Sequence, residues 1–93
     1  MSGVNEKEAR MTRSRKIAKL IEQWDKAVRY AVQVSRKDKR LSQETVADRM
    51  AWSVDVMANM EQGRRDITVA EFIVLAQQIG VDPETMFRRV VKF

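Results

Sequence analysis

The residues best suited to chemistry lie within one short segment in the second half of the chain. Asp55, Asn59 and Gln62 follow one another at spacings of four and three residues, which places them on one face of a helix. Met57 and Met60 have the spacing of the opposite, apolar face. An asparagine carboxamide can bind adenine through two hydrogen bonds, and an aspartate can accept a hydrogen bond from cytosine N4. A helix with a buried apolar face and a short, polar outer face would fit a DNA major groove.

The composition argues against an enzyme. The 93 residues include no cysteine and no histidine, which excludes zinc sites of the Cys/His type and nucleophiles activated by histidine. Carboxylates such as Asp82 and Glu84 stand at helix-capping positions. The sequence pattern suggests no cluster of carboxylates suited to metal binding or acid–base catalysis. We therefore expect no catalysis, no metal and no cofactor. The lack of cysteine is compatible with a cytoplasmic protein, and no apolar run is long enough to predict a membrane span.

The chain is basic, with a net charge of +5 and a pI of about 10.0. The positive charge is concentrated in residues 1–16, 36–40 and 88–93, and each of these segments carries three more cations than anions. A basic domain of this size is suited to a polyanionic partner. Solvated tails and loops would produce the same composition, so the charge alone leaves both interpretations open.

Hydrophobic periodicity divides the chain into an arm and a domain. Residues 1–13 show little apolar periodicity, and we expect them to form a flexible basic arm. Between residues 14 and 38 the apolar side chains recur every three or four residues, which predicts one long amphipathic helix. They are Ile17, Leu20, Ile21, Trp24, Val28, Ala31 and Val32. Residues 14–93 are therefore expected to form the folded domain.

Four shorter helices are predicted after this one from their capping residues. Side chains that can accept hydrogen bonds from a first helical turn stand at Ser42, Ser53, Thr68 and Asp82. Glu71 completes a capping box with Thr68, and Pro83 follows Asp82 at the first helical position. Gly63 and Gly80 stand where the third and fourth helices should end. Because no segment is convincing as a strand, the sequence predicts an all-α fold of five helices.

An ordered set of motifs runs through the second half of the chain. It begins with Leu41, Ser42 and Gln43, continues with Ala47, Ser53 and the run Glu61-Gln62-Gly63-Arg64, and ends with IGVDPETMF at residues 79–87. In this order and spacing the motifs resemble those of phage repressor/Cro-like helix-turn-helix proteins, the XRE family. The run LSQETVADRM is especially similar to lambdoid repressors. The resemblance covers about residues 36–90, and it implies a compact five-helix, repressor-like helix-turn-helix domain.

The resemblance also implies a function, which is sequence-specific binding of DNA by a transcriptional repressor. The third helix, about residues 53–62, would read the major groove. The DNA-binding residues that it implies are Gln43, Ser53, Val54, Asp55, Asn59, Gln62, Arg64 and Arg65. Val54, Asp55 and Asn59 match positions that face bases, and Val54 could touch a thymine methyl group. Gln43, Gln62, Arg64 and Arg65 match positions that face phosphates, where contacts supply affinity.

Two further contacts are implied within the protein. Arg36 and Glu61 match an ion pair of the family, partly buried between the first helix and the end of the third. Gln43 would brace the third helix in addition to binding a phosphate. An exposed glutamine and ordinary surface charges are the alternatives at these positions.

The apolar C-terminal end predicts self-association. Phe87, Val90, Val91 and Phe93 exceed what a final helix needs for one core. We therefore expect a homodimer through the C-terminal helix that binds double-stranded DNA at an inverted-repeat operator.

Several residues depart from the family pattern. Ala51 replaces a glycine common in the turn, and a left-handed alanine costs on the order of 1 kcal/mol. Arg40 also replaces a glycine, and Trp52 stands where a small aliphatic residue is usual, so we expect it to be half-buried. Asp55 puts a negative charge on the face directed at DNA. It could read a cytosine, complement the helix dipole or mark a loss of DNA binding.

The last possibility at Asp55 leads to an alternative function. The same scaffold could bind another protein, as an antiactivator, an antitoxin or an anti-host factor. Trp24 and Tyr30 on the long first helix, together with the apolar C-terminus, could contact such a partner.

Overall fold

The computed structural model describes residues 5–93, and this part of the chain forms five helices and no strand. The predicted all-α, five-helix fold is thus confirmed. None of these helices combines the length and the apolar composition that crossing a membrane requires.

The first helix is longer than the periodicity predicts. Helix α1 runs over Glu6–Asp38, and Asn5 caps it by accepting a hydrogen bond of 2.8 Å from the backbone N–H of Glu8. Glu6 and Glu8 complement the positive end of the helix dipole. The predicted helix start at residue 14 is therefore wrong, and residues 6–13 of the expected arm are helical. Residues 1–4 of that arm lie outside the described residues.

The four shorter helices begin where their capping residues predict. Helix α2 spans Gln43–Arg49, α3 spans Val54–Glu61, α4 spans Val69–Ile79 and α5 spans Pro83–Val91. Their N-caps are Ser42, Ser53, Thr68 and Asp82, and each side chain accepts a hydrogen bond from the first turn. The capping box between Thr68 and Glu71 is present in both directions.

Helices α1 to α4 end in the same way, with one residue in the left-handed conformation. That residue is Arg40 after α1 (φ 57°), Ala51 after α2 (φ 55°), Gly63 after α3 (φ 82°) and Gly80 after α4 (φ 91°). The next N–H in each case bonds a carbonyl five residues earlier, at 2.8–3.1 Å. Only glycine adopts this conformation without strain, so Arg40 and Ala51 each cost on the order of 1 kcal/mol.

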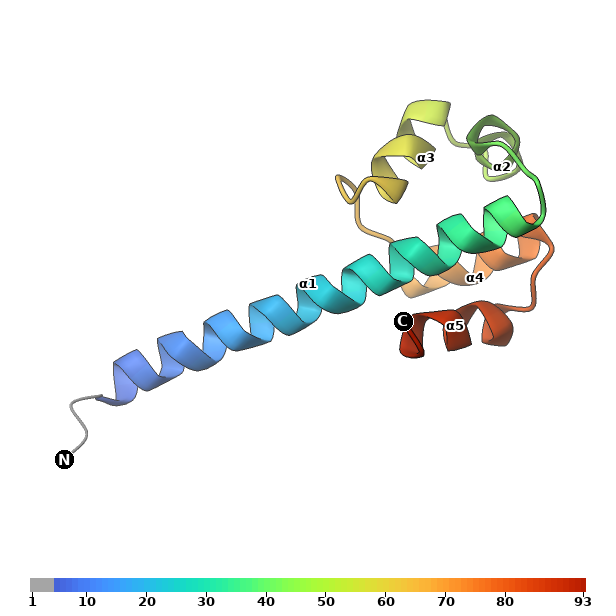
Figure 1. The fold of residues 1–93 in the computed structure, drawn as a ribbon. Coiled ribbons are helices and arrows are strands. Elements are labelled where there is room, and N and C mark those ends of the chain that lie inside the picture. The colour runs from blue at the N-terminus through green and yellow to red at the C-terminus, as the bar shows by residue number, and fades with distance from the viewer. Residues whose placement is uncertain (1–4) are drawn as a thin grey trace.

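The helices pack around the C-terminal half of α1. Helix α5 lies along α1, α4 lies beside both, and α3 covers another face of the same segment, while α2 packs against α3 and α4 (Figure 1). The core consists of Ala27, Ala31, Val32, Val46, Ala47, Met57, Met60, Phe72, Leu75, Ala76, Ile79, Met86 and Val90. Trp52 is partly buried against this core, as expected.

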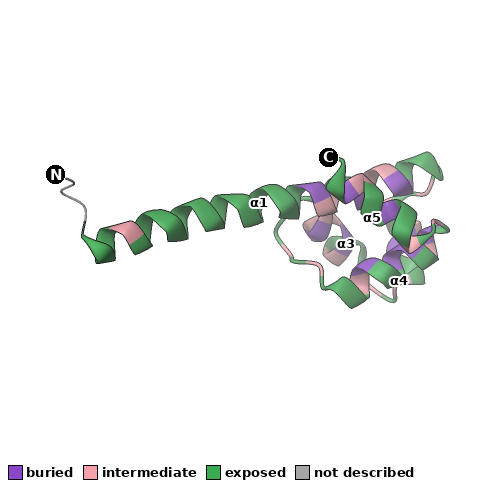
Figure 2. Cartoon of the chain, turned by 90° about the horizontal axis from the view of Figure 1, so that it is seen from below, coloured by how far each residue is buried: buried purple, intermediate pink, exposed green. Residues whose placement is uncertain are grey.

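The N-terminal half of α1 projects from this body. From Glu6 to Lys26 every residue is exposed except Ala9, which is half-exposed, and burial begins at Ala27 (Figure 2). The extents of the molecule, 59 × 25 × 19 Å, reflect this projection. Ile17, Leu20, Ile21 and Trp24 therefore lie outside the core, although their spacing continues that of Val28 and Ala31.

Candidate nucleic-acid interface

Helices α2 and α3 form a sharp corner that turns one face of α3 outward. The two helices are joined by residues 50–53, and Ala47, 2% exposed, allows them to approach closely. Ala51 in this turn keeps the left-handed conformation, with a φ of 55°, and the N–H of Trp52 bonds the carbonyl of Ala47 at 2.9 Å. Ser53 caps α3 by accepting a hydrogen bond of 3.3 Å from the N–H of Val56.

Helix α3 has the two faces that its sequence predicts. Met57 and Met60 are completely buried against the core. On the opposite side Val54 is 42% exposed, Asp55 is exposed, and Asn59 is half-buried. Gln62, the C-cap of the helix, is exposed on the same side. The outer face is therefore narrow and short-chained, and it carries hydrogen-bonding groups beside one small apolar side chain.

A buried ion pair holds the C-terminal end of α3 on α1. Arg36 donates from Nε and Nη2 to the two carboxylate oxygens of Glu61, at 2.7 and 2.9 Å. The side chains of Arg36 and Glu61 are 9% and 1% exposed. Arg36 also donates to the carbonyl of Leu41 at 2.8 Å, and Gln43 donates from Nε2 to Glu61 Oε1 at 2.9 Å. Gln43 thus ties the first turn of α2 to the end of α3, which is the bracing role expected of it.

The predicted role of Arg65 requires a guanidinium that is free to bind a phosphate, but this guanidinium is engaged within the protein. Its guanidinium donates to both carboxylate oxygens of Glu71, at 2.7 and 3.3 Å, and lies 4.6 Å from the ring centroid of Trp52. The hydrogen bond from Arg65 lowers the pKa of Glu71, and the N–H of Thr68 lowers it further. Because Glu71 belongs to the capping box of α4, this ion pair fastens the loop after α3 to the start of α4.

Arg64 differs from its neighbour. It follows Gly63, its side chain is exposed, and it forms no ion pair within residues 5–93. Its N–H closes the end of α3 on the carbonyl of Asn59 at 2.8 Å. Its backbone is therefore fixed next to the outer face of α3, while its guanidinium remains available to an anion.

Two arginines that support this region were not predicted from the sequence. A Cβ at Gly63 would lie 2.7 Å from Cζ of Arg29, so this cation rests on the backbone at the negative end of α3. Its spacing of seven residues from Arg36 places both arginines on one face of α1, which was an available signal. Arg89 joins α5 to α1 through Asp38 at 2.8 Å and Ser35 at 3.2 Å, and no local pattern indicates this pairing.

Comparisons with known proteins bear on the fold. No protein-family model matches the chain, and no curated protein matches it in sequence. A solved structure, an XRE-family like protein from Pseudomonas syringae pv. tomato str. DC3000, superposes with a TM-score of 0.76 at 18% sequence identity. The superposition covers 83% of this chain and 94% of that one. The chain therefore has an XRE-like fold, within which α2 and α3 correspond to the helix-turn-helix predicted from the sequence.

Proposed function

We propose that the protein is a cytoplasmic transcriptional regulator, a repressor, that binds double-stranded DNA in a sequence-specific manner with α3 in the major groove. The observation that carries this proposal is the outer face of α3, which is exposed at Val54 and Asp55 and half-buried at Asn59. The C-terminal end of the helix is held by the buried pair of Arg36 and Glu61. A rigid helix with a narrow polar face is what direct reading of base edges requires.

Each residue of this face has a distinct role in the proposal. Asn59 forms two hydrogen bonds to an adenine, Val54 contacts a thymine methyl group, and Asp55 accepts a hydrogen bond from cytosine N4. The phosphate contacts come from Arg64 and from three polar residues around the helix termini, Gln43, Ser53 and Gln62. Because Arg65 is paired with Glu71, its contribution is mainly to hold the loop that carries Arg64.

The first test is selection of binding sites from random duplexes, followed by measurement of affinity against salt concentration. Asn59→Ala should remove the preference at one base position and cost about 1–3 kcal/mol on the selected site, with little change in the salt slope. Arg64→Ala should keep the selected motif and reduce the salt slope by about 1.

Arg88→Ala is the matched control for Arg64→Ala, because Arg88 is an exposed cation on α5, away from α3. It should leave the salt slope nearly unchanged. If Arg64→Ala and Arg88→Ala reduce the slope equally, Arg64 acts only through net charge. If the wild-type protein shows no salt-dependent binding to any duplex, the proposed function is wrong.

Asp55→Ala tests the residue that fits DNA least well. If Asp55 reads a cytosine, the variant loses selectivity at that base pair. If it only complements the dipole of α3, nonspecific affinity should rise, because a negative charge near the phosphates has gone.

The proposal includes a homodimer on an inverted repeat. Phe87, Val91 and Phe93 at the C-terminal end are 50–65% exposed, so apolar surface for self-association is present there. Val90, which was expected to contribute, is 4% exposed and belongs to the core. Sedimentation of the DNA complex should show two protomers per selected site.

A second candidate is a protein-binding module, such as an antiactivator, an antitoxin or an anti-host factor. The exposed carboxylate of Asp55 on the outer face of α3 favours it, because this charge opposes DNA binding. Under this alternative the outer face of α3 contacts a partner protein. Substitutions on that face then weaken partner binding and do not change the affinity for DNA.

A further inference from the structure

The projecting half of α1 carries an apolar face that its own body does not cover. The four side chains of this face share one side of the helix, and each is 49–56% exposed. They are Ile17, Leu20, Ile21 and Trp24, and we call them the α1 stripe.

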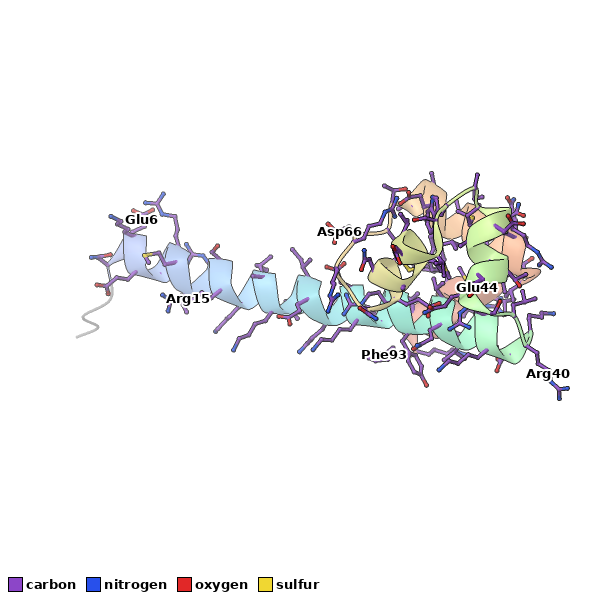
Figure 3. All side chains as sticks on the ribbon, turned by 90° about the horizontal axis from the view of Figure 1, so that it is seen from above. Glu6, Arg15, Arg40, Glu44, Asp66 and Phe93 are labelled. Atoms are coloured by element: carbon purple, nitrogen blue, oxygen red, sulfur yellow. The ribbon has the colours of Figure 1, made fainter. Side chains whose placement is uncertain are left out.

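The stripe and the body lie on the same side of α1. Ile21 and Trp24 precede Val28 and Ala31 by seven residues, so each lies almost directly in line with its successor. Val28 and Ala31 pack in or against the core. The stripe therefore faces the inner corner between the projecting helix and the end of the body, and Phe93 lies beside α1 at that corner (Figure 3). A partner that covers the stripe must fit into this corner.

A second uncovered apolar surface lies on the body, between α4 and α5. Residues of these two helices line a groove there, and among them Val69 is 78% exposed, Ile73 is 41% exposed and Phe87 is 55% exposed. Val91, which is 50% exposed, follows Phe87 by four residues on the same side of α5. Because the lining comes from α4 and α5, this α4–α5 groove opens on the side of the two helices that is turned away from α1.

We infer that the α1 stripe of each copy binds the α4–α5 groove of a second copy, so that two chains exchange their projecting helices. The stripe and the groove of one chain face the same way. A twofold axis perpendicular to α1 therefore turns the groove of the second copy toward the stripe of the first, and it brings the second stripe onto the first groove. This inference deepens the homodimer of the proposed function, and it rests on that function for its role at DNA.

The directions of the helices agree with this exchange. Helix α5 runs antiparallel to α1, because Arg89 pairs with Asp38 at 2.8 Å while Phe93 packs edge-on against Tyr30. Helix α4 begins beside Val28, and both helices lie along α1 (Figure 1). The groove is thus nearly parallel to the projecting helix of a second copy, which can lie between α4 and α5 as a third packed helix.

The stripe and the groove also lie at matching distances from the axis. With the axis level with Ala27, where burial of α1 begins, Ile21 is about 9 Å from it along α1. Ile73 lies four residues after Val69, which is beside Val28, so it is about 8 Å from the axis on the other side. Ile21 of one copy therefore meets Ile73 of the other. The second body occupies the corner, and no part of the second chain enters the space that α4 and α5 fill.

Charge favours the same arrangement. Arg13 and Lys16 continue the stripe toward the N-terminus, each four residues before one of its members. They reach the end of the groove formed by the first turn of α5, where Glu84 is part of the lining. Arg88 lines the groove one turn nearer the axis, where Trp24 of the second copy arrives, and a cation over an indole ring is favourable. A dimer made of two grooves would leave the basic end of the stripe without an anion.

The exchange leaves α3 uncovered. Arg29 and Arg36, against which α3 rests, lie about 120° around α1 from the centre of the stripe. Helix α3 therefore lies to the side of each contact, and its outer face stays accessible to DNA.

The interface consists of two equal contacts. Each partner contributes one stripe and one groove, which brings the buried surface toward the roughly 800 Å² per partner of a stable complex. We expect a dimer that forms at micromolar concentration and becomes tighter when both copies bind one DNA molecule.

The first experiment measures the oligomeric state without DNA, by sedimentation of the full chain over a range of micromolar concentrations. The wild type should dimerise, and Ile21→Glu and Ile73→Lys should each weaken the dimer by about tenfold or more, because each sets a charge against an apolar side chain. Met11→Glu is the control on α1, since Met11 is 50% exposed and lies about 130° away from the stripe. Val74→Lys is the control on α4, since Val74 is 40% exposed and lies outside the groove lining.

The decisive measurement mixes the Ile21→Glu and Ile73→Lys proteins. In their heterodimer one stripe and groove are both unchanged, and in the other contact the introduced carboxylate meets the introduced ammonium group. In either homodimer both contacts oppose a charge to an apolar side chain. The mixture should therefore dimerise more tightly than either variant alone, by about tenfold or more.

Four outcomes would overturn the inference. They are a wild type that stays monomeric, a stripe or groove variant that dimerises like the wild type, an equal loss in the two controls, and a mixture that dimerises no better than the separate variants. A loss in Ile73→Lys with none in Ile21→Glu would show a dimer of two grooves.

Crosslinking tests the same contact without a change of charge, because the chain has no cysteine of its own. Ile21→Cys and Ile73→Cys proteins are oxidised separately and as an equal mixture. The exchange predicts disulfides mainly between the two different proteins. Disulfides that form mainly within either protein alone would contradict it.

The inference and the proposed function can fail separately. A protein that dimerises by exchange and binds no duplex would retain the inference and contradict the function. A monomer that selects a specific duplex with Asn59 would do the reverse.

Discussion

The two halves of α1 have the same apolar repeat and opposite surroundings. In the C-terminal half, Ala27, Ala31 and Val32 are at most 1% exposed, beneath α3, α4 and α5. In the N-terminal half, Ile17 and Ile21 are more than half exposed. An apolar stripe therefore predicts a surface suited to packing, and it does not show whether the packing partner belongs to the same chain.

Charged residues show the same contrast. The ion pair of the covered half, Arg36 with Glu61, is bidentate and almost completely buried. The pair of the projecting half, Lys26 with Glu22, has a separation of 3.9 Å and side chains 59% and 68% exposed. Desolvation makes the first pair costly to break, whereas water screens the second.

The largest expected difference between the halves is in local stability. In dilute protein the amides of residues 31–36 should exchange with solvent only through global unfolding, at a cost of about 5 kcal/mol or more. The amides of residues 8–16 should open at close to zero cost, because an unpacked helix is marginal in water. Hydrogen exchange followed by NMR measures both. Equal protection along α1 in dilute protein would contradict the comparison.

The second effect comes from the buried ion pair. Glu61→Ala should lower the free energy of unfolding by about 3–5 kcal/mol, because it leaves Arg36 buried without its anion. Glu22→Ala, the control in the projecting half, should change it by less than about 0.5 kcal/mol. Denaturant titration of both variants gives the two values, and similar losses would show that the burial of Arg36 is unimportant.

The third expected effect comes from a larger side chain on the buried or on the exposed half of α1. Ala31→Leu should destabilise the protein by about 1–3 kcal/mol, because Ala31 is completely buried and the added atoms have no space. Ala18→Leu makes the same change on the exposed half, and it should be neutral in dilute protein. Thermal melting compares them directly. If Ala31→Leu is tolerated as well as Ala18→Leu, α1 is less tightly packed against α4 and α5 than the complete burial of Ala31 indicates.

The smallest expected effect is a gain in stability from one substitution to glycine and no global change from another. Arg40→Gly should stabilise the fold by a few tenths to about 1 kcal/mol, because it relieves a left-handed conformation after the covered half. Lys19→Gly weakens the projecting helix locally by about 1 kcal/mol, yet it should leave the global unfolding transition of dilute protein unchanged. A melting temperature lowered by Lys19→Gly would show that the projecting half unfolds together with the body.

The start of α1 was missed although its capping residue, Asn5, is present in the sequence. Residues 6–13 lack an apolar stripe, and the prediction of an arm followed from that absence. The helix there depends instead on the cap from Asn5, on early acidic residues and on the lack of helix breakers. Apolar periodicity reports a buried face, so it is silent about a helix that no other element covers.

Local residue types were enough to predict where α2 to α5 begin and that α3 has one buried and one outer face. Caps and turns depend on atoms within four or five residues along the chain, so local residue types suffice to predict them. Three features come from the packing of distant segments: burial of α1 begins at Ala27, Arg65 pairs with Glu71, and Arg29 rests against Gly63. These features depend on which distant segments meet in space. The burial and the ion pairs of a side chain are set by the segments that pack against it, and residues nearby in sequence do not reveal them.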